Sequence, residues 1–423
     1  MTTRRTTQYG TSFAAPEKTD YGKKSWMCLY HRAVSRLAAN EERGTDGYSH
    51  LLKGKVLYMV FEKLERLEEF MRLGFMAAGV PEEDAEICAA VLIESDKRGI
   101  ESHGVARFKP IYIDKIKDGT LIPKTNFDII RQGPTTAVID GHDGMGHVIG
   151  VKSTKLAIEK AKQYGMGMVA VRNSNHYGIA GYFTMMAAEA GMIGITGTNA
   201  RPCIAPTFGV DNMMGTNPLT FGMPTDEDFP FIMDCATSII QRGKVEHYSR
   251  IGKKLPEGWV IDTDGNTVTD PHTALKGFDA GTCALVTLGG MGEEMSGHKG
   301  YGYATVVEIL SASLQAGVFL KALNGFEPDG TPRPIKNGHF FIAIDISAFI
   351  DLEEFKHTTG EILRGLRNSK KVPDEKRIYT AGEKEYLAYL ERSEKGVPLN
   401  ESVQKSLTAV RDDLKINFKF SWE

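Results

Sequence analysis

The sequence predicts an α/β fold, and three observations support this prediction. Between about residues 135 and 223, short strand-like runs such as TTAVID and GMVAVR alternate with helix-like runs such as KSTKLAIEKAKQY. Gly191 follows the second helix-like run, AGYFTMMAAEA, at a position where glycine commonly ends a helix. Further on, the glycine-rich entry GHKGYG leads into an apolar helix-like run, and HFFIAIDISAF follows as a buried strand.

The segments on either side of this region are predicted to be mainly helical, apart from an N-terminal extension. Residues 60–78 and 81–97 carry apolar residues at helical spacing, and Pro81 followed by three acidic residues is a good helix start. The tail from Glu353 onward is charged and helical, and Asp264-Gly265 is predicted to be a hairpin turn rather than part of a calcium loop. Residues 1–57 show little apolar pattern, so we treat them as an N-terminal extension of unknown role.

Composition excludes several classes of function. The chain has 423 residues and a net charge of −3 from 51 basic and 54 acidic residues, so no nucleic-acid partner is indicated. No uncharged apolar run approaches the roughly 20 residues that span a bilayer, and the N-terminus lacks a secretory signal. The five cysteines are scattered without C-x-x-C pairs, which is typical of free thiols in a reducing compartment. We therefore expect a cytoplasmic protein with no membrane partner.

The run GHDGMGHVIG at residues 141–150 resembles a dinucleotide fingerprint at first sight. It lies between a strand-like and a helix-like run, but its spacing is G-x-G-x-x-x-G. The next strand ends in Arg172 instead of an acidic residue, and His147 occupies a position where a small residue is expected. A tight turn, which glycine permits, is the favoured interpretation.

Two histidines stand beside residues that suit an acid substrate. In ESHGVARF, a helical turn would place His103 and Arg107 on one face, where an arginine fork could hold a carboxylate and an imidazole could exchange a proton. In VRNSNHYGIAGYF, His176 lies in a polar loop between a strand and a helix, where α/β proteins place their sites. The alternatives are a surface arginine beside a histidine at a helix end, and a structural histidine.

The remaining histidines and the cysteines do not indicate a metal site. We interpret the other single histidines as capping or surface residues, namely His142, His147, His247, His298 and His339. No H-E-x-x-H motif, no pair of cysteines and no close cluster of carboxylates is present, so no metal is predicted.

Seven motifs in order resemble the type-2 malate/L-lactate dehydrogenases. They are SHGVARF, NSNHYGIAGYF, GTNPLTFGMPT, FIMDCATS, GHKGYGYATVVEIL, HFFIAID and YTAGEKEY, and they cover residues from about 58 to 400. This family of nicotinamide-dependent oxidoreductases also includes ureidoglycolate, sulfolactate and diketogulonate dehydrogenases and a cyclic-imine reductase. The resemblance implies a non-Rossmann α/β fold with a mixed, largely antiparallel sheet and flanking helices, and a homodimer with the site near the subunit contact.

The resemblance also implies the domains and the site residues. It implies a helical substrate and dimerisation domain at 58–134, completed by the C-terminal helices of 345–423, and an α/β cofactor-binding domain at 135–344. Either His103 or His176 would transfer the proton, and Arg107 would hold the carboxylate of a small 2-oxo or 2-hydroxy acid. The implied cofactor residues are Asp234, Cys235, Ala236, Thr237, Lys299, Gly382, Glu383, Lys384 and Asn199.

The cofactor and the substrate are left partly open by the sequence. NAD is favoured over NADP because Asp234 would repel a 2′-phosphate if it lies at the adenosine ribose. Many members have a second arginine and an aromatic residue after the first arginine, whereas here Phe108, Lys109, Pro110 and Ile111 follow before Tyr112. Malate/oxaloacetate or lactate/pyruvate is the first expectation. The other substrates of the family remain alternatives, as does a cofactor-independent lyase that uses the same histidines.

Overall fold

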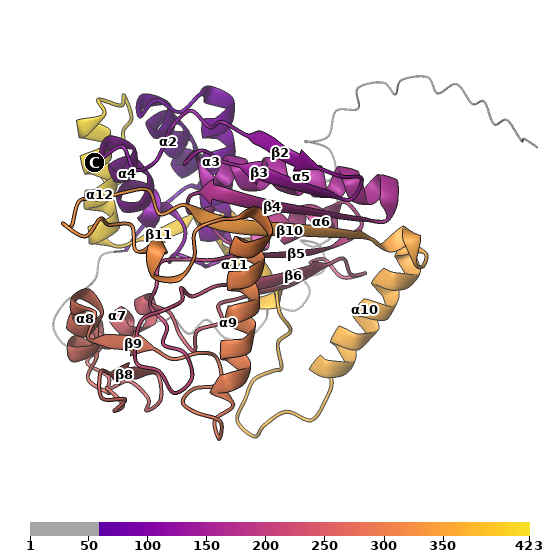
Figure 1. Ribbon diagram of the computed structural model, residues 1–423. Helices are drawn as coiled ribbons and strands as arrows, with labels where there is room; N and C mark the ends of the chain where they lie inside the picture. Colours follow the sequence, from indigo (N-terminus) through magenta and orange to yellow (C-terminus); the bar gives the residue numbers. More distant parts are fainter. Residues whose placement is uncertain (1–58) are drawn as a thin grey trace, which may run out of the picture. The chain divides into compact units, whose positions relative to one another are not determined.

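The computed structural model describes residues 59–423, and its largest sheet has seven strands (Figure 1). In order across the sheet they are β2 (Asp128–Gln132), β3 (Thr136–Asp140), β4 (Met166–Ser174), β10 (Asn337–Asp345), β5 (Met192–Thr198), β6 (Leu219–Met223) and β7 (Phe231–Cys235). The β3–β4 pair is parallel and the other neighbours are antiparallel. The prediction of a mixed, largely antiparallel sheet with flanking helices is therefore confirmed, and this sheet is not a parallel Rossmann sheet.

Two helices pack on one face of this sheet. Helix α5 (Gly146–Tyr164) lies against β4 and β10, and α6 (Gly181–Glu189) lies against β5 and β6. The approach of α6 is close because Gly194 and Gly222 have no side chains. A Cβ at either position would lie within 3 Å of backbone atoms of Thr184. Val169 and Val171 of β4 pack with apolar side chains of α5 and α6 in one hydrophobic core.

Helix α9 (Gly297–Ala312) contacts the beginning of β10. Gly338 lies against the backbone carbonyl of Ser311, where a Cβ would meet the oxygen at 1.7 Å. The predicted glycine-rich entry is the first turn of α9, and the predicted strand HFFIAID is part of β10.

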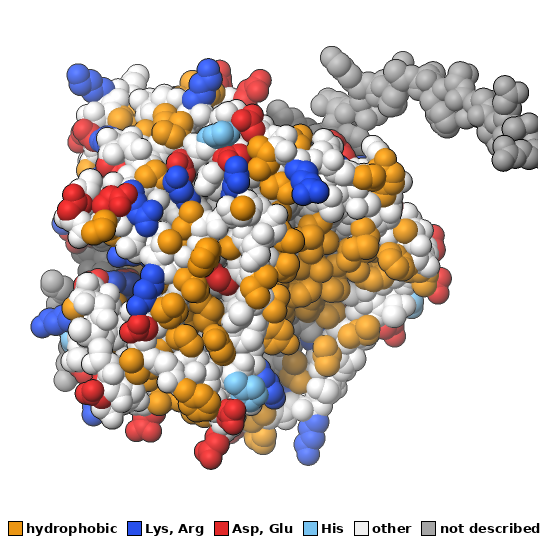
Figure 2. Space-filling model, viewed as in Figure 1, with side chains coloured by type: hydrophobic (Ala, Val, Ile, Leu, Met, Phe, Trp, Pro, Cys, Tyr) orange, Lys and Arg blue, Asp and Glu red, His pale blue; other side chains and the backbone are white. Residues whose placement is uncertain are grey.

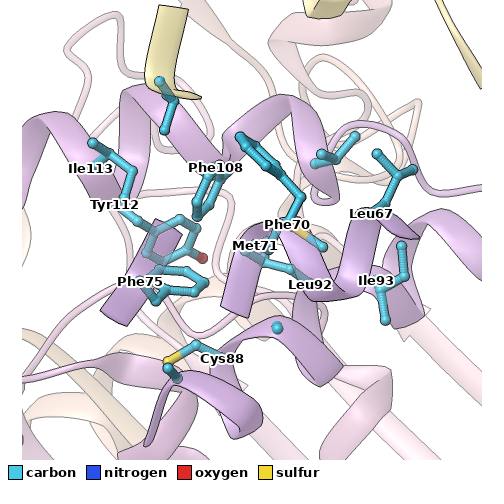
Figure 3. Packing of buried hydrophobic residues seen from close by; sticks show 14 of the residues in the cluster. Leu67, Phe70, Met71, Phe75, Cys88, Leu92, Ile93, Phe108, Tyr112 and Ile113 are labelled. Carbon is cyan, nitrogen blue, oxygen red and sulfur yellow. The ribbon is translucent and has the colours of Figure 1, made fainter. Parts of the chain in front are cut away.

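The helical part combines segments from both ends of the described chain. Helices α2 (Leu64–Ala77), α3 (Glu82–Lys97), α4 (Asp114–Lys117) and α12 (Glu401–Asp413) surround one core, and β1 (Val60–Glu62) pairs with β11 (Val397–Leu399). Phe75 and Phe108 pack edge to face in this core, with ring centroids 5.0 Å apart. Figure 3 shows both side chains among their apolar neighbours. The predicted helices at 60–78 and 81–97 are present, although the first begins only after the short strand β1.

A small lobe with its own core is inserted between β7 and α9. It contains α7 (Arg242–Arg250), β8 (Val260–Asp262), α8 (Pro271–Ala280) and β9 (Cys283–Leu285). The predicted turn at Asp264-Gly265 is confirmed, because Asp262 Oδ1 accepts hydrogen bonds from the backbone N–H groups of Asp264 and Asn266, both at 2.9 Å.

The last helices rejoin the main body. Helix α10 (Leu352–Arg367) is tied by Arg364 to Asp226, and α11 (Glu383–Lys395) contacts α3. The N-terminal extension predicted at 1–57 lies outside the described residues.

One row of apolar side chains crosses the sheet without a covering helix among residues 59–423. The row consists of register partners on five adjacent strands, namely Met168, Ile342, Ile195, Phe221 and Met233. Their side chains are half-buried or exposed, and they belong to none of the hydrophobic cores. Figure 2 shows hydrophobic side chains gathered between α9 and α10 on this side of the molecule. We call this row the open sheet face.

Candidate active site

His103 and Arg107 lie in the loop that follows α3. The N–H of His103 donates to the carbonyl of Ile100 at 3.0 Å, and Val105–Arg107 forms one 3₁₀ turn. Arg107 Nε donates to the carbonyl oxygen of Ser102 at 2.5 Å, and Ser102 Oγ lies 2.8 Å from His103 Nδ1. The segment therefore turns tightly, as the sequence suggested, and holds both side chains in one short loop.

His176 lies in the loop between β4 and α6, and its ring faces that of His103. The two imidazoles are nearly parallel, with centroids 5.6 Å apart and an interplanar angle of 21°. The structure thus brings together the two histidines that the sequence singled out, although 73 residues separate them. Two imidazoles at this separation can serve one reacting oxygen and a neighbouring group of the same small substrate.

Tyr112 connects His176 to a third histidine. Its hydroxyl lies 2.5 Å from His176 Nδ1 and 2.9 Å from His147 Nε2. Tyr112 belongs to a π-helical turn at Phe108–Ile113, a local widening that often occurs at functional sites. The interpretation of His147 as a capping or surface residue is wrong, because it is fully buried in this network. His339 is also fully buried, stacked on Tyr177 with centroids 4.4 Å apart, so the same interpretation is wrong there.

The surroundings of the histidines favour neutral rings. Burial, with a smaller contribution from the Arg107 charge, lowers the pKa of His103 to about 4. Burial lowers the pKa of His147 to about 3, and it also lowers the pKa of His176 well below its usual range. At neutral pH these rings are therefore neutral imidazoles, the form that accepts a proton from a substrate hydroxyl in oxidation.

A cavity of about 240 Å³ opens beside His103 and contains several of the predicted cofactor residues. Its lining includes His103, Asp234, Ala236 and Gly382, together with apolar walls such as Ile179 and Phe229. The proton-transfer candidate and the cofactor candidates from three distant segments therefore share one cavity.

Asp234 is held by two hydrogen bonds at the wall of this cavity. The Gly181 N–H donates to Oδ2 at 2.8 Å, and the Thr220 hydroxyl donates to Oδ1 at 3.0 Å. The carboxylate is open to the cavity, but the protein atoms packed around it raise its pKa, more than these hydrogen bonds lower it. Each carboxylate oxygen keeps a lone pair with which to accept from a ligand hydroxyl.

The other predicted cofactor residues do not line this cavity. Lys299 is exposed on the first turn of α9, and Lys384 is exposed with its ammonium 4.8 Å from the ring of Tyr379. The carboxylate of Glu383 is buried and paired with Arg377. The Asn199 side chain is buried, and it bonds Val318 O and Gly338 N.

Two further predicted residues shape the end of β7. The Thr237 hydroxyl donates to the carbonyls of Thr216 and Asn217, at 3.1 and 3.0 Å. Cys235 pairs with Leu219 in the sheet, and its thiol donates to the Ala236 carbonyl at 3.2 Å. Both side chains bond to backbone carbonyls of the protein, and Ala236, which lies between them in the sequence, lines the cavity.

The glycine string at 141–150 supports the loop of His176. A Cβ on Gly146 would lie 2.3 Å from the carbonyl oxygen of Asn175 and 2.4 Å from that of His176. Glycine at this position lets the first turn of α5 pack directly on the histidine loop. This geometry agrees with the interpretation of the string as a tight turn.

A sequence profile described as malate/L-lactate dehydrogenase matches residues 63–408. The chain belongs to the malate/L-lactate dehydrogenase family. The matched range contains every site residue named above and begins after the N-terminal extension.

Named relatives in the malate/L-lactate dehydrogenase family are similar to this chain over nearly their whole length. Malate dehydrogenase from Pyrococcus horikoshii is 45% identical over 346 residues, which cover 82% of this chain and 93% of that protein. L-sulfolactate dehydrogenase from Methanocaldococcus jannaschii is 39% identical over 344 residues, covering 81% and 93%. The crystal structure of malate dehydrogenase from Entamoeba histolytica has a TM-score of 0.83 and 42% identity, covering 86% of this chain and 100% of that one.

The described part of this family member contains neither a group of potential metal ligands nor a helix suited to a membrane. Within residues 59–423, no three or more His, Cys, Asp or Glu side chains are grouped so that they could hold a metal ion. No helix in the same range combines the length and the apolar character that a membrane crossing requires. The four cysteines in this range are free thiols.

Proposed function

We propose that this protein transfers a hydride between NAD and a small 2-oxo or 2-hydroxy acid, with oxaloacetate/malate as the first pair to test and pyruvate/lactate as the second. The stacking of His103 on His176, beside Arg107 and at the wall of the Asp234 cavity, carries this proposal. Membership of an oxidoreductase family, with relatives named malate dehydrogenase, supports it.

The chain's own residues would orient the acid and handle its proton. The planar Arg107 guanidinium binds the substrate carboxylate in two-point contact, which fixes the face that the 2-carbon presents. One of the two stacked imidazoles, in its protonated form, gives a proton to the substrate oxygen in reduction, and in its neutral form it takes that proton back in oxidation. When bound, the nicotinamide ring supplies or accepts the hydride.

The cavity has the chemistry that the reactive half of such a cofactor needs. Asp234 can accept hydrogen bonds from ribose hydroxyls, as acidic residues do in other dinucleotide sites. Ile179 and Phe229 provide apolar walls for a flat ring, and backbone of Gly382 lies close enough to Pro230 that a Cβ would be 2.8 Å from its carbonyl oxygen. The residues present therefore fit a nicotinamide nucleoside.

NAD is proposed over NADP on the charge of the cavity. Asp234 and Glu385 both line it, so it would repel the 2′-phosphate that NADP carries on its adenosine ribose. This repulsion applies to the binding mode in which the adenosine half, in place of the nicotinamide, enters this cavity. Comparing NADH with NADPH at equal concentrations tests this choice. A clear preference for NADPH would contradict it.

Lys115 favours a dicarboxylic substrate over a monocarboxylic one. Its ammonium is close enough to His176 to contribute to the lowered pKa of that ring, and burial lowers the pKa of Lys115 itself. Together with Arg107, it provides a second cation near the histidines for the distal carboxylate of oxaloacetate. A sulfonate carries the same charge, so sulfolactate remains the second candidate, supported by the 39% identical relative.

The open sheet face supports a homodimer. Five apolar side chains in one row across five strands are half-buried or exposed in the isolated chain, and apolar surfaces of this kind commonly mark subunit contacts. Light scattering should give a dimer mass for the wild type. Phe221→Asp should shift the mass toward the monomer, whereas Val372→Asp, at an exposed apolar residue elsewhere, should not. A monomeric wild type would contradict the homodimer.

One experiment tests the reaction itself. NADH and NADPH oxidation would be followed with oxaloacetate, pyruvate and sulfopyruvate as substrates. His176→Ala or His103→Ala should lower the rate roughly 10²- to 10⁴-fold for the residue that transfers the proton. The mechanism is wrong if both variants keep near-normal turnover. No turnover with any of the acids, and no change in NADH fluorescence on mixing, would favour the cofactor-independent lyase.

A further inference from the structure

We propose that Tyr112 and His147 hold His176 in the tautomer that carries its single proton on Nε2. Tyr112 and His147 are thereby positioning residues, because they act on the substrate only through His176. The importance of this tautomer for turnover rests on the proposed function, whereas the tautomer itself is a property of the resting protein.

The hydroxyl of Tyr112 requires one of two histidine nitrogens to accept a hydrogen bond and the other to donate one. It lies within hydrogen-bond distance of His176 Nδ1 and of His147 Nε2, at 2.5 and 2.9 Å. A hydroxyl has one proton, so it donates to one ring nitrogen and accepts from the other. Whichever nitrogen accepts must be unprotonated, and the other must carry a proton.

A backbone group decides between the two arrangements. The Gly178 N–H points at His176 Nδ1 from 3.3 Å, and a backbone N–H can only donate. His176 Nδ1 is therefore the unprotonated nitrogen, and Tyr112 donates to it. In a neutral imidazole the proton then resides on Nε2.

His147 fits the other half of this arrangement. Its Nε2–H must donate to the Tyr112 oxygen, which leaves a lone pair on Nδ1. That nitrogen is fully buried and has no hydrogen-bond partner in the described part of the chain. A stranded acceptor lone pair occurs more readily in proteins than a stranded N–H group, so the reverse arrangement is disfavoured.

The groups around His176 oppose the alternative of a doubly protonated ring. Burial has the largest effect on its pKa, and a proton on His103 or His147 and the standing charges of Lys115 and Arg107 oppose its protonation further. Tyr112 is the remaining titratable group in contact with the ring, and burial raises its pKa well above its usual value, so its hydroxyl keeps its proton. The neutral tautomer is thus the resting form.

The consequence for catalysis concerns the nitrogen left for the substrate. Nδ1 is occupied by Tyr112 and Gly178, whereas Nε2 has no hydrogen-bond partner among residues 59–423. Nε2–H is therefore a fixed donor for the carbonyl oxygen of a 2-oxo acid, and it can stabilise the negative charge that develops there. Without Tyr112, the proton could move to Nδ1 and leave Nε2 as an acceptor that repels the carbonyl.

The tautomer can be measured directly by nitrogen NMR on the full-length protein labelled with ¹⁵N-histidine. Long-range ¹H–¹⁵N spectra distinguish the protonated from the bare nitrogen, and loss of a signal set in His176→Gln assigns the ring. We expect His176 to show a bare Nδ1 and a protonated Nε2 at neutral pH without any ligand. A proton on Nδ1 in the wild type would overturn the proposal.

Variants of the two positioning residues provide the second test. Tyr112→Phe keeps the buried ring and should give a mixture of His176 tautomers, with kcat lowered roughly 10- to 100-fold and KM little changed, as for partners that orient histidine ligands. His147→Gln keeps a donor near the Nε2 position and should retain the tautomer, whereas His147→Leu should lose it. His339→Leu is the matched control, because His339 is equally buried but bonds Thr198 instead of Tyr112.

These outcomes separate the tautomer from the proposed reaction. If Tyr112→Phe stays folded by its thermal transition and keeps a pure Nε2–H tautomer, the proposal is wrong. If the wild type shows the Nε2–H tautomer but oxidises no nicotinamide with any acid, the proposed function fails while the positioning by Tyr112 stands.

Discussion

The buried carboxylate of Asp96 accepts a hydrogen bond from the backbone N–H of Val105 at 2.7 Å. Asp96 is the penultimate residue of α3, and Val105 begins the turn that carries Arg107. A Cβ on Gly104 would lie 2.3 Å from the carboxylate atoms, so the loop wraps closely around Asp96. One acidic side chain therefore fixes the path of the loop that presents His103.

The free energy of unfolding of Asp96→Asn, relative to that of the wild type, should increase as the pH rises. Burial raises the pKa of Asp96 to about 7, more than the Val105 hydrogen bond and the Arg392 charge lower it. The folded state then binds more protons than the unfolded state between about pH 4 and 7, so the wild type loses stability as pH rises through this range, by up to about 1.4 kcal/mol per pH unit.

Urea unfolding of the wild type and Asp96→Asn at pH 5 and pH 8 measures this difference. Asparagine keeps an oxygen that can accept from Val105 but cannot ionise. A constant difference in the free energy of unfolding at both pH values would contradict a titrating Asp96.

Buried histidines should have the opposite effect to Asp96: they should lower the free energy of unfolding as the pH falls. Burial lowers the pKa of His339 and of His147 to about 3, and the pKa of His103 is lowered to about 4. Because these values lie below the unfolded value of 6.5, the unfolded state binds more protons as the pH falls. Their contribution to stability is complete above about pH 6.5 and is lost as the pH falls from there toward 3.

The free energy of unfolding measured by urea between pH 7 and pH 4 checks this prediction. Carboxyls whose pKa is raised by burial, such as those of Asp96 and Asp234, contribute in the opposite direction, so the comparison with a histidine variant isolates the effect of one imidazole. His339→Leu should reduce the slope by up to about 1.4 kcal/mol per pH unit, since one buried imidazole no longer has to be charged on unfolding at low pH. An unchanged slope in this variant would show that His339 does not contribute.

The elements that sequence reasoning predicted well are those with a local signal. The alternation at residues 135–223 and the helical spacing at 81–97 depend on neighbours a few residues apart, and the corresponding strands and helices are present. His103 and His176 were found because each stands in a polar loop at the end of a regular element. The packing that places their rings 5.6 Å apart joins the loop after α3 to the loop after β4, and it could not be read from the sequence.

The parts of the site that were missed depend on contacts between distant segments. Tyr112 meets His147 across 35 residues and His176 across 64, and no spacing rule connects these three. The one available signal was His147 itself, an unexpected large residue behind Gly146. Asn199 was predicted to bind the cofactor, but its side chain is already bonded to Val318 and Gly338. Nothing in its sequence context reveals these bonds.

Replacing Lys115 with methionine should separate dicarboxylic from monocarboxylic substrates. The change removes the second cation near His176 but keeps an unbranched chain of similar size. We expect KM for oxaloacetate to rise roughly tenfold to a hundredfold, the cost of one hydrogen bond to a charged group, while KM for pyruvate changes little.

Steady-state kinetics with both acids measures this difference, and Lys405→Met is a control at an exposed surface lysine on α12. Equal losses with oxaloacetate and pyruvate would mean that Lys115 does not bind the distal carboxylate. The assignment of a dicarboxylic substrate would then lose its structural support.

Adding one methyl group at Gly146 should disturb the His176 loop more than it disturbs the fold. In Gly146→Ala the new Cβ would press on the carbonyl oxygens of Asn175 and His176, where it would lie 2.3 and 2.4 Å away. Backbone atoms cannot rotate aside as a side chain can, so the loop must move. We expect a loss of roughly 1–3 kcal/mol in the free energy of unfolding, typical of overpacking, together with a large fall in kcat.

Gly365→Ala is the matched control, because Gly365 lies within α10 and a Cβ there would meet nothing within 4 Å. Alanine at this helical position should raise the free energy of unfolding by roughly 0.5–1 kcal/mol and leave turnover unchanged. Thermal unfolding and steady-state kinetics of the two variants give both quantities. If Gly146→Ala retained wild-type kcat, the close packing of α5 on the His176 loop would not be needed for catalysis, and the glycine string would serve the fold alone.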